Sequence, residues 1–205
     1  MWGPWIWNSW APVYERLWVQ DWVLGKTRDA VRQRLHEVGG DARSVLDVGC
    51  GTGQLLDEIA QLRPGLQLHG LDPSSAMIAQ ARQRHGRVDY RVGRLCDEDR
   101  GPFDLVCMCN AFPYVSDHDR AARELFRLTR PGGRCWIVQG NTETLYDVLG
   151  LAVIKLTVSR STYHSARELH AIFCAAGFDE SVTRMIDKAL WLPSVQLCEF
   201  VRPVE

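Results

Sequence analysis

The segment Val45–Gly53 constrains the fold more than any other part of the chain, because an apolar run ends there in closely spaced glycines. These glycines occupy positions 49, 51 and 53. Glycine tolerates positive φ and leaves room for a ligand against the backbone. A loop of this kind at the start of a helix also presents free backbone N–H groups. The segment therefore predicts a buried strand, a ligand-binding turn and a helix, in that order.

A second acidic position supports a ligand site beside this loop. The spacing G-x-G-x-G differs from the G-x-G-x-x-G of dinucleotide-binding proteins. Another apolar run ends at Leu71 and Asp72. An acid at the end of such a strand can accept hydrogen bonds from two ribose hydroxyls. The two features together indicate a ligand that contains a ribose.

Strands and helices alternate along most of the chain. We expect strands over residues 44–48, 66–71, 88–92, 103–109 and 134–139, and helices over 12–37, 53–62, 75–84, 118–129, 142–156 and 165–176. Alternation of this kind favours a parallel sheet with right-handed crossovers. No helix separates the last two expected strands, 179–186 and 190–201, so they are expected to form a hairpin.

Composition narrows the class of protein. The 205 residues suffice for one domain with a substantial core. The net charge is −1 without a long basic cluster, which argues against a nucleic-acid partner. No apolar run is long enough for a transmembrane helix, and the N-terminus lacks the pattern of a signal peptide. A cytoplasmic location is therefore expected, with peripheral membrane contact as an alternative.

The seven cysteines are odd in number and form no C-x-x-C pair, which is typical of reduced thiols in a cytosolic protein. Cys107 and Cys109 would point to the same face of one strand, and paired thiols can bind a metal. Because no third ligand stands near them in the sequence, no metal site is expected.

Four segments of the chain resemble the class I S-adenosylmethionine-dependent methyltransferases. They are Val45–Gly53, Leu71–Ile78, Phe103–Val106 and Arg130–Arg134. They follow the family's order and spacing within roughly residues 40–140. The resemblance implies an α/β fold with a Rossmann-like, doubly wound sheet. This sheet would be mostly parallel, with one antiparallel strand near the C-terminus and an N-terminal helical lid.

The resemblance also implies a division of the chain into parts. A single methyltransferase domain is expected over residues 1–205. Residues 1–40 would form the aromatic-rich helical lid, and residues 41–140 the cofactor-binding core. Residues 141–178 would form a helical region that covers the substrate, and residues 179–205 a C-terminal β-hairpin.

The implied cofactor is S-adenosyl-L-methionine. Asp72 would take the ribose hydroxyls, unless it only caps the next helix, and Asp47 would face the ammonium group, unless it only holds the turn. The family often has an acid after the third strand to bind the adenine amine, where this chain has Arg94. Either Asp97 or the backbone near Leu95 would then bind the adenine. The expected cofactor-binding residues are Tyr14, Asp47, Gly49, Cys50, Gly51, Gly53, Asp72, Pro73, Met77, Leu95, Asp97 and Asn110.

Methyl transfer from a sulfonium needs positioning and desolvation, and it needs a base only where the acceptor must lose a proton. The candidates for a catalytic role are Tyr14, His118 and His164. The sequence favours a surface position over a catalytic role for each histidine, and the alternative for Tyr14 is an aromatic residue packed on the sheet. Phe112, Pro113 and Tyr114 stand where relatives frequently have Leu-His-His. An inherited base is therefore doubtful, and this edge of the pocket becomes more apolar.

Six of the eight tryptophans lie between residues 2 and 22. One interpretation is an aromatic lid that also lines an apolar substrate pocket. A second is a membrane-interface anchor, which the scarcity of nearby Lys and Arg weakens. A third is packing against the sheet or a dimer partner. Residues 8–15 also resemble the N-terminal segment of methyltransferases that act on quinone precursors and phospholipids.

The expected function is methyl transfer from S-adenosylmethionine to a small, largely apolar acceptor such as a quinone precursor, a lipid or an aromatic metabolite. The protein would act as a monomer or homodimer. One alternative is a protein that binds S-adenosylmethionine or S-adenosylhomocysteine without transferase activity. A nicotinamide-dependent oxidoreductase is disfavoured by the glycine spacing and by Pro131–Gly133.

Overall fold

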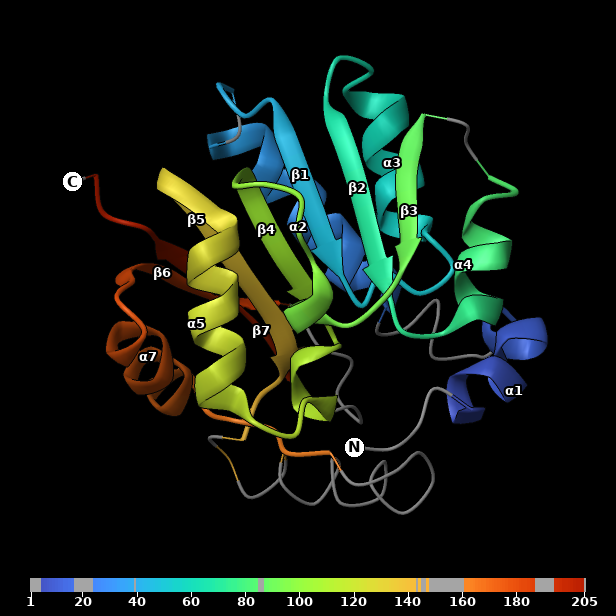
Figure 1. Ribbon diagram of the computed structural model, residues 1–205. Helices are drawn as coiled ribbons and strands as arrows, with labels where there is room; N and C mark the ends of the chain where they lie inside the picture. Colours follow the sequence, from blue (N-terminus) through green and yellow to red (C-terminus); the bar gives the residue numbers. More distant parts are fainter. Residues whose placement is uncertain are drawn as a thin grey trace.

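A computed structural model of the chain describes residues 5–16, 24–38, 40–84, 87–142, 144, 147, 161–186 and 194–204 (Figure 1). In these residues a seven-stranded sheet has the order β3-β2-β1-β4-β5-β7-β6. The strands are β1 Ser44–Val48, β2 Gln67–Asp72, β3 Val88–Val92, β4 Phe103–Cys109, β5 Thr129–Gly140, β6 Asp179–Ile186 and β7 Val195–Val201.

The strand directions agree with the predicted doubly wound fold. β1 pairs in parallel with β2 and β4, β2 with β3, and β4 with β5. β7 runs antiparallel to both of its neighbours, β5 and β6. The prediction of a mostly parallel sheet with one antiparallel strand near the C-terminus is therefore confirmed.

Helices cover both faces of the sheet (Figure 1). The helices are α1 Trp5–Tyr14, α2 Gly25–Val38, α3 Gln54–Leu62, α4 Ser75–Ala81, α5 His118–Leu128 and α7 Ala166–Ala175, with short 3₁₀ helices η2 Leu95–Asp97 and η3 Phe112–Tyr114. One buried cluster joins the sheet to α2, α3 and α4, and the other joins it to α5 and α7. Strands buried on both faces explain the continuous apolar runs in the sequence.

Two predicted elements differ most in extent from the observed ones. The expected helix over 12–37 is wrong in its extent, because α1 ends at Tyr14 and α2 begins at Gly25. β5 begins at Thr129, earlier than the expected start at 134, because Arg130–Gly133 pairs with the C-terminal segment. Gly132 donates its N–H to the carbonyl of Arg202, and Arg202 donates to the carbonyl of Gly133. The predicted helix over 142–156 lies largely outside the described residues.

A buried ion pair joins α2 to β7. The guanidinium of Arg34 donates to both carboxylate oxygens of Glu199, at 2.7 and 3.0 Å. Arg34 is 7% exposed and Glu199 is fully buried. Arg134 on β5 donates to the same carboxylate.

None of the helices in the described residues has the length and apolar character needed to cross a bilayer.

We expect Glu199→Gln to lower the free energy of unfolding by about 3 kcal/mol, because Arg34 loses its buried partner and keeps only Glu37 of its own helix. Urea denaturation followed by circular dichroism measures this change. As a control, Arg91→Gln removes an exposed pair with Asp99 and is expected to cost less than about 1 kcal/mol. Equal losses in the two variants would contradict the importance of the buried pair.

Candidate cofactor site

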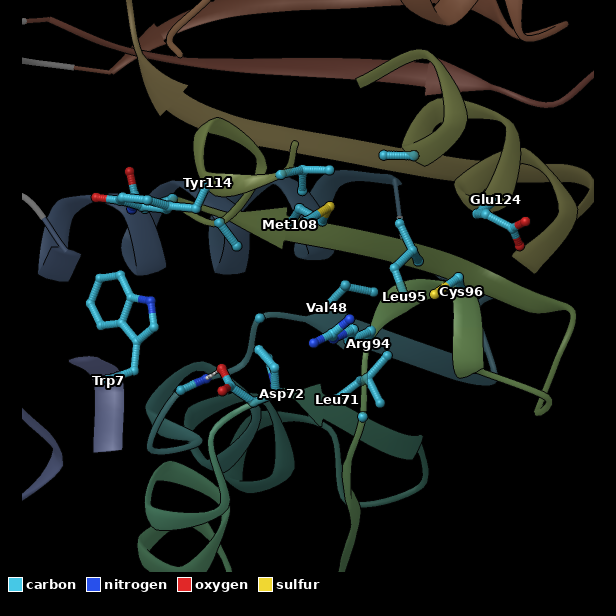
Figure 2. A pocket seen from close by; sticks show the side chains of 18 of the residues that line it. Trp7, Val48, Leu71, Asp72, Arg94, Leu95, Cys96, Met108, Tyr114 and Glu124 are labelled. Atoms are coloured by element: carbon cyan, nitrogen blue, oxygen red, sulfur yellow. Dashed lines mark hydrogen bonds between the residues drawn. The ribbon is translucent and has the colours of Figure 1, made fainter. Parts of the chain in front are cut away.

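A cavity of about 280 Å³ opens at the carboxyl ends of the parallel strands (Figure 2). We call it the carboxyl-edge cavity. It is lined by residues that follow β1, β2, β3 and β4, together with residues of α1 and the first turns of α5. It lies where the strand order reverses between β1 and β4. Open α/β sheets bind their ligands at this position.

All three loop glycines have positive φ, but the space that a side chain would find differs among them. An added Cβ on Gly49 would lie 2.4 Å from the Cβ of Ala111, and one on Gly53 would lie 2.4 Å from the hydroxyl of Tyr90. At Gly51, with φ of +54°, no atom lies within 4 Å of an added Cβ. Packing against protein therefore demands Gly49 and Gly53, whereas Gly51 faces open space at the cavity.

Asp72 connects the loop after β1 to the end of β2. One carboxylate oxygen accepts the N–H of Ser74 at 2.8 Å, and the other accepts the N–H of Gly51 at 3.0 Å. Burial raises the pKa of Asp72, although these two hydrogen bonds act against the rise. Each oxygen keeps a lone pair for a further donor. Ser74, whose hydroxyl accepts the N–H of Met77, caps α4, so the cap does not use Asp72.

Asp47 lies beneath the loop and does not line the cavity. Its side chain is almost fully buried, and one of its oxygens accepts the thiol of Cys107 at 3.6 Å. Burial raises the pKa of Asp47 to about 7. A cation close to this buried carboxyl would stabilise its ionised form.

Aromatic rings of α1 and η3 form one side of the cavity, which we call the aromatic wall. It consists of Trp7, Tyr14 and Tyr114. The ring of Trp7 meets those of Tyr114 and Tyr14 edge-on, with centroids 5.3 and 6.5 Å apart. Figure 2 shows Trp7 and Tyr114 on the same side of the cavity, with Asp72 below them. Burial raises the pKa of Tyr14 to about 12, so its hydroxyl stays protonated.

Asn8 attaches α1 to the cofactor side of the sheet. Its side-chain oxygen accepts the hydroxyl of Ser74 at 2.6 Å and the N–H of Ala76 at 3.2 Å. Figure 1 shows α1 beside α4. These bonds hold Trp7 and Tyr14 at the cavity. Sequence reasoning missed Asn8, because its partners lie more than sixty residues away.

The structure brings most of the predicted cofactor residues to one cavity. Those that line it are Tyr14, Gly49, Gly51, Asp72, Pro73, Met77, Leu95 and Asn110. Those that do not line it are Asp47, Cys50, Gly53 and Asp97. The carboxylate of Asp97 accepts the N–H of Arg94 at 3.3 Å. Asn110 has φ of +56° and donates to the hydroxyl of Thr27 at 3.4 Å.

His118 and His164 lie outside the cavity lining, behind η3. Their rings meet edge-on with centroids 4.6 Å apart, and both pack on Phe112. Burial lowers the pKa of each histidine. Nε2 of His118 lies 3.2 Å from the carbonyl oxygen of Phe112, which can only accept, so this nitrogen carries the proton. His118 therefore contacts the backbone and the ring of Phe112 in η3, and His164 contacts the rings of Phe112 and His118.

The rim of the cavity holds charged residues that the sequence did not single out. They are Asp117, Arg120 and Glu124, all from the start of α5 or the residue that caps it. Asp117 caps α5 by accepting the N–H of Arg120 at 2.9 Å. Arg94 also lines the cavity and lies near Leu71 in Figure 2. The cavity therefore combines an aromatic side with a charged rim.

Comparisons with known proteins match this chain to methyltransferases. Residues 46–135 match the model of a family described as a methyltransferase domain. A trans-aconitate 2-methyltransferase of Deinococcus radiodurans is 38% identical over 90 residues, which is 43% of this chain and 34% of that protein. A ubiquinone biosynthesis O-methyltransferase of Xanthomonas oryzae pv. oryzae is 34% identical over 147 residues, covering 66% of this chain and 59% of that protein. The chain thus spans less than two thirds of the length of either relative.

Solved structures share the fold over most of its length. A possible histamine N-methyltransferase of Thermotoga maritima has a TM-score of 0.79 at 21% identity, covering 98% of this chain and 100% of that one. The magnesium protoporphyrin IX methyltransferase of Synechocystis with bound S-adenosylhomocysteine has a TM-score of 0.71 at 22% identity, covering 86% and 82%. The sheet, the cavity and the methyltransferase-domain match together show that residues 46–135 belong to a methyltransferase domain of the class I, S-adenosylmethionine-dependent type.

Proposed function

We propose that the chain transfers the methyl group of S-adenosylmethionine to a small acceptor with substantial apolar surface, such as a quinone precursor, a lipid or an aromatic metabolite. One observation carries the proposal. A single cavity joins the glycine loop and Asp72 to the aromatic wall. Cofactor and acceptor would therefore share one enclosed space, as direct methyl transfer requires.

The residues of the cavity fit the cofactor. Asp72 has oxygen lone pairs free for ribose hydroxyls, and the space at Gly51 lets a ligand approach the backbone. Pro73, Met77 and Leu95 supply apolar surface for the adenine ring. Asp47, which lies beneath the loop and outside the cavity lining, would stabilise the charge of the ammonium group from below. When bound, S-adenosylmethionine supplies an activated methyl group.

An apolar acceptor is supported by the aromatic wall and by the relatives. Trp7 and Tyr114 would cover a flat or greasy molecule and exclude water from it. One relative is named for ubiquinone biosynthesis, and one fold neighbour acts on magnesium protoporphyrin IX. The position of Trp7 at the cavity favours the lid interpretation of the N-terminal segment. Trp2, Trp18 and Trp22 lie outside the described residues.

Positioning is the main catalytic contribution that we assign to this chain. Tyr14 stays protonated because of its raised pKa, so it would orient the acceptor or cofactor by donating a hydrogen bond. His118 and His164 would act through Tyr114 by holding η3 in place. In this scheme an acceptor that must lose its proton releases it to solvent or to its own neighbouring groups.

Incubation of the pure protein with methyl-labelled S-adenosylmethionine and a host-cell extract tests the proposed function. We expect label in the organic phase after partition between solvent and water. Label confined to the aqueous phase would contradict an apolar acceptor. Binding of S-adenosylhomocysteine without any labelled product would favour the alternative, a cofactor-binding protein without transferase activity.

We expect Asp72→Ala to weaken binding of S-adenosylhomocysteine by about tenfold or more, because charge-assisted hydrogen bonds to the ribose are lost. Isothermal titration calorimetry measures the affinity, and circular dichroism checks the fold. The matched control is Asp99→Ala, which removes an exposed acid that does not line the cavity. Equal affinity in the two variants would contradict the assignment of Asp72.

Substitution of Gly53 should affect stability, whereas substitution of Gly51 should affect ligand binding. We expect Gly53→Ala to lower the melting temperature, because its Cβ would collide with Tyr90 in a left-handed conformation. Gly51→Ala meets no neighbouring atom and should cost only about 1 kcal/mol of backbone strain. It should nevertheless weaken S-adenosylhomocysteine binding, measured by calorimetry. A Gly51→Ala protein with native affinity would show that the ligand does not approach this position.

A further inference from the structure

Three metal-binding side chains meet beneath the glycine loop, and we call them the thiol–carboxylate cluster. Cys107 and Cys109 lie two residues apart on β4 and share one face of the sheet, and Asp47 on β1 pairs in register with Cys107. One ligand atom from each of the three side chains lies within 4.8 Å of the other two. The neighbouring strand thus supplies the third ligand that was not found near the cysteines in the sequence.

The spacing in the cluster is close to that of a coordinated cation. Metal–sulfur bonds of about 2.3 Å and metal–oxygen bonds of about 2.0 Å in a tetrahedron place ligand atoms about 3.5–3.8 Å apart. The thiol of Cys107 already lies 3.6 Å from an oxygen of Asp47. Small side-chain rotations would therefore bring all three ligands onto one ion.

The donor set selects a thiophilic ion. Two thiolates and one carboxylate suit zinc, cadmium or similar borderline and soft cations. Calcium and magnesium require oxygen ligands in larger number. Among the described residues no cationic side chain is paired with Asp47, so a bound cation would also stabilise its buried charge.

The cluster has a route to solvent through the carboxyl-edge cavity. Asp47 and Cys107 are buried, whereas Cys109 is partly exposed and lines the cavity. An ion held by the three side chains would keep a fourth coordination position, which can open toward the cavity beside Cys109. The cluster therefore adjoins the space that the cofactor would occupy.

We propose that Asp47, Cys107 and Cys109 bind one thiophilic divalent cation, and that this binding competes with the cofactor. On binding, two S–H bonds break, and two metal–sulfur bonds and one metal–oxygen bond form. Both thiol protons, and the carboxyl proton where Asp47 carries one, pass to solvent, and no electron is transferred. The competition rests on the proposed function, because Asp47 cannot face the cofactor's ammonium group while it coordinates a cation. The cation site itself does not depend on that function.

Cadmium titration tests the site. The titrations start from a double variant, Cys96→Ser with Cys174→Ser, which we call the parent. It lacks an exposed and a partly exposed thiol that lie outside the cluster. We expect the parent to bind one Cd²⁺ per chain and to show ultraviolet cadmium–thiolate absorption. Cys109→Ala should raise the Kd for Cd²⁺ about tenfold or more. The matched control Cys135→Ala removes a buried thiol on the other face of the sheet and should keep the parent's Kd.

The result that overturns the site is equal Cd²⁺ affinity in the parent and in Cys109→Ala, or the absence of cadmium–thiolate absorption in a folded parent. Asp47→Asn provides a second variant that leaves both thiols in place, and it should also weaken Cd²⁺ binding. Circular dichroism verifies that each variant is folded before titration.

A second titration tests competition. We expect the apparent Kd of S-adenosylhomocysteine to rise with Cd²⁺ concentration in the parent. An unchanged Kd at saturating Cd²⁺ would overturn the competition. If S-adenosylhomocysteine binds to no variant even without Cd²⁺, the proposed function fails and the competition with it, whereas the cadmium stoichiometry still decides the cation site.

Discussion

The turn after β1 depends on hydrogen bonds to the end of β2. Gly49 and Cys50 both donate their backbone N–H groups to the carbonyl of Leu71, at 2.7 and 3.2 Å. The carboxylate of Asp72 then accepts the N–H of Gly51 from the same turn. These three bonds fix the loop over the adjoining strand. Because the loop is held from below, Gly51 can leave its outer side open to the cavity.

The N-terminal helix completes the site from the other direction. α1 is far from the loop in sequence, yet Asn8 bonds to the first turn of α4, directly after Asp72. One short segment at the end of β2 therefore organises both Asp72, the acid that we propose for the ribose, and the attachment of the aromatic wall. A change in this segment would disturb both sides of the carboxyl-edge cavity together.

Much of the sheet could be predicted from sequence, because strands buried on both faces have uninterrupted apolar runs. β1, β3 and β4 have the predicted bounds. The extent of β5 could not be predicted, because Arg130–Gly133 is extended by pairing with distant residues near Arg202. Contacts between distant segments also account for what was missed in the site. Asp47 meets Cys107 across strands, and Trp7 meets Tyr114 across more than one hundred residues.

The pair between Arg34 and Glu199 has a consequence for the order of folding. Its partners are separated by 165 residues. Until β7 docks, Arg34 has only the partly exposed Glu37 of its own helix as a carboxylate partner. The N-terminal half of the core therefore gains its full stability only when this late strand has joined the sheet. Such a long-range requirement couples the two halves of the domain into one cooperative unit and slows its folding during synthesis.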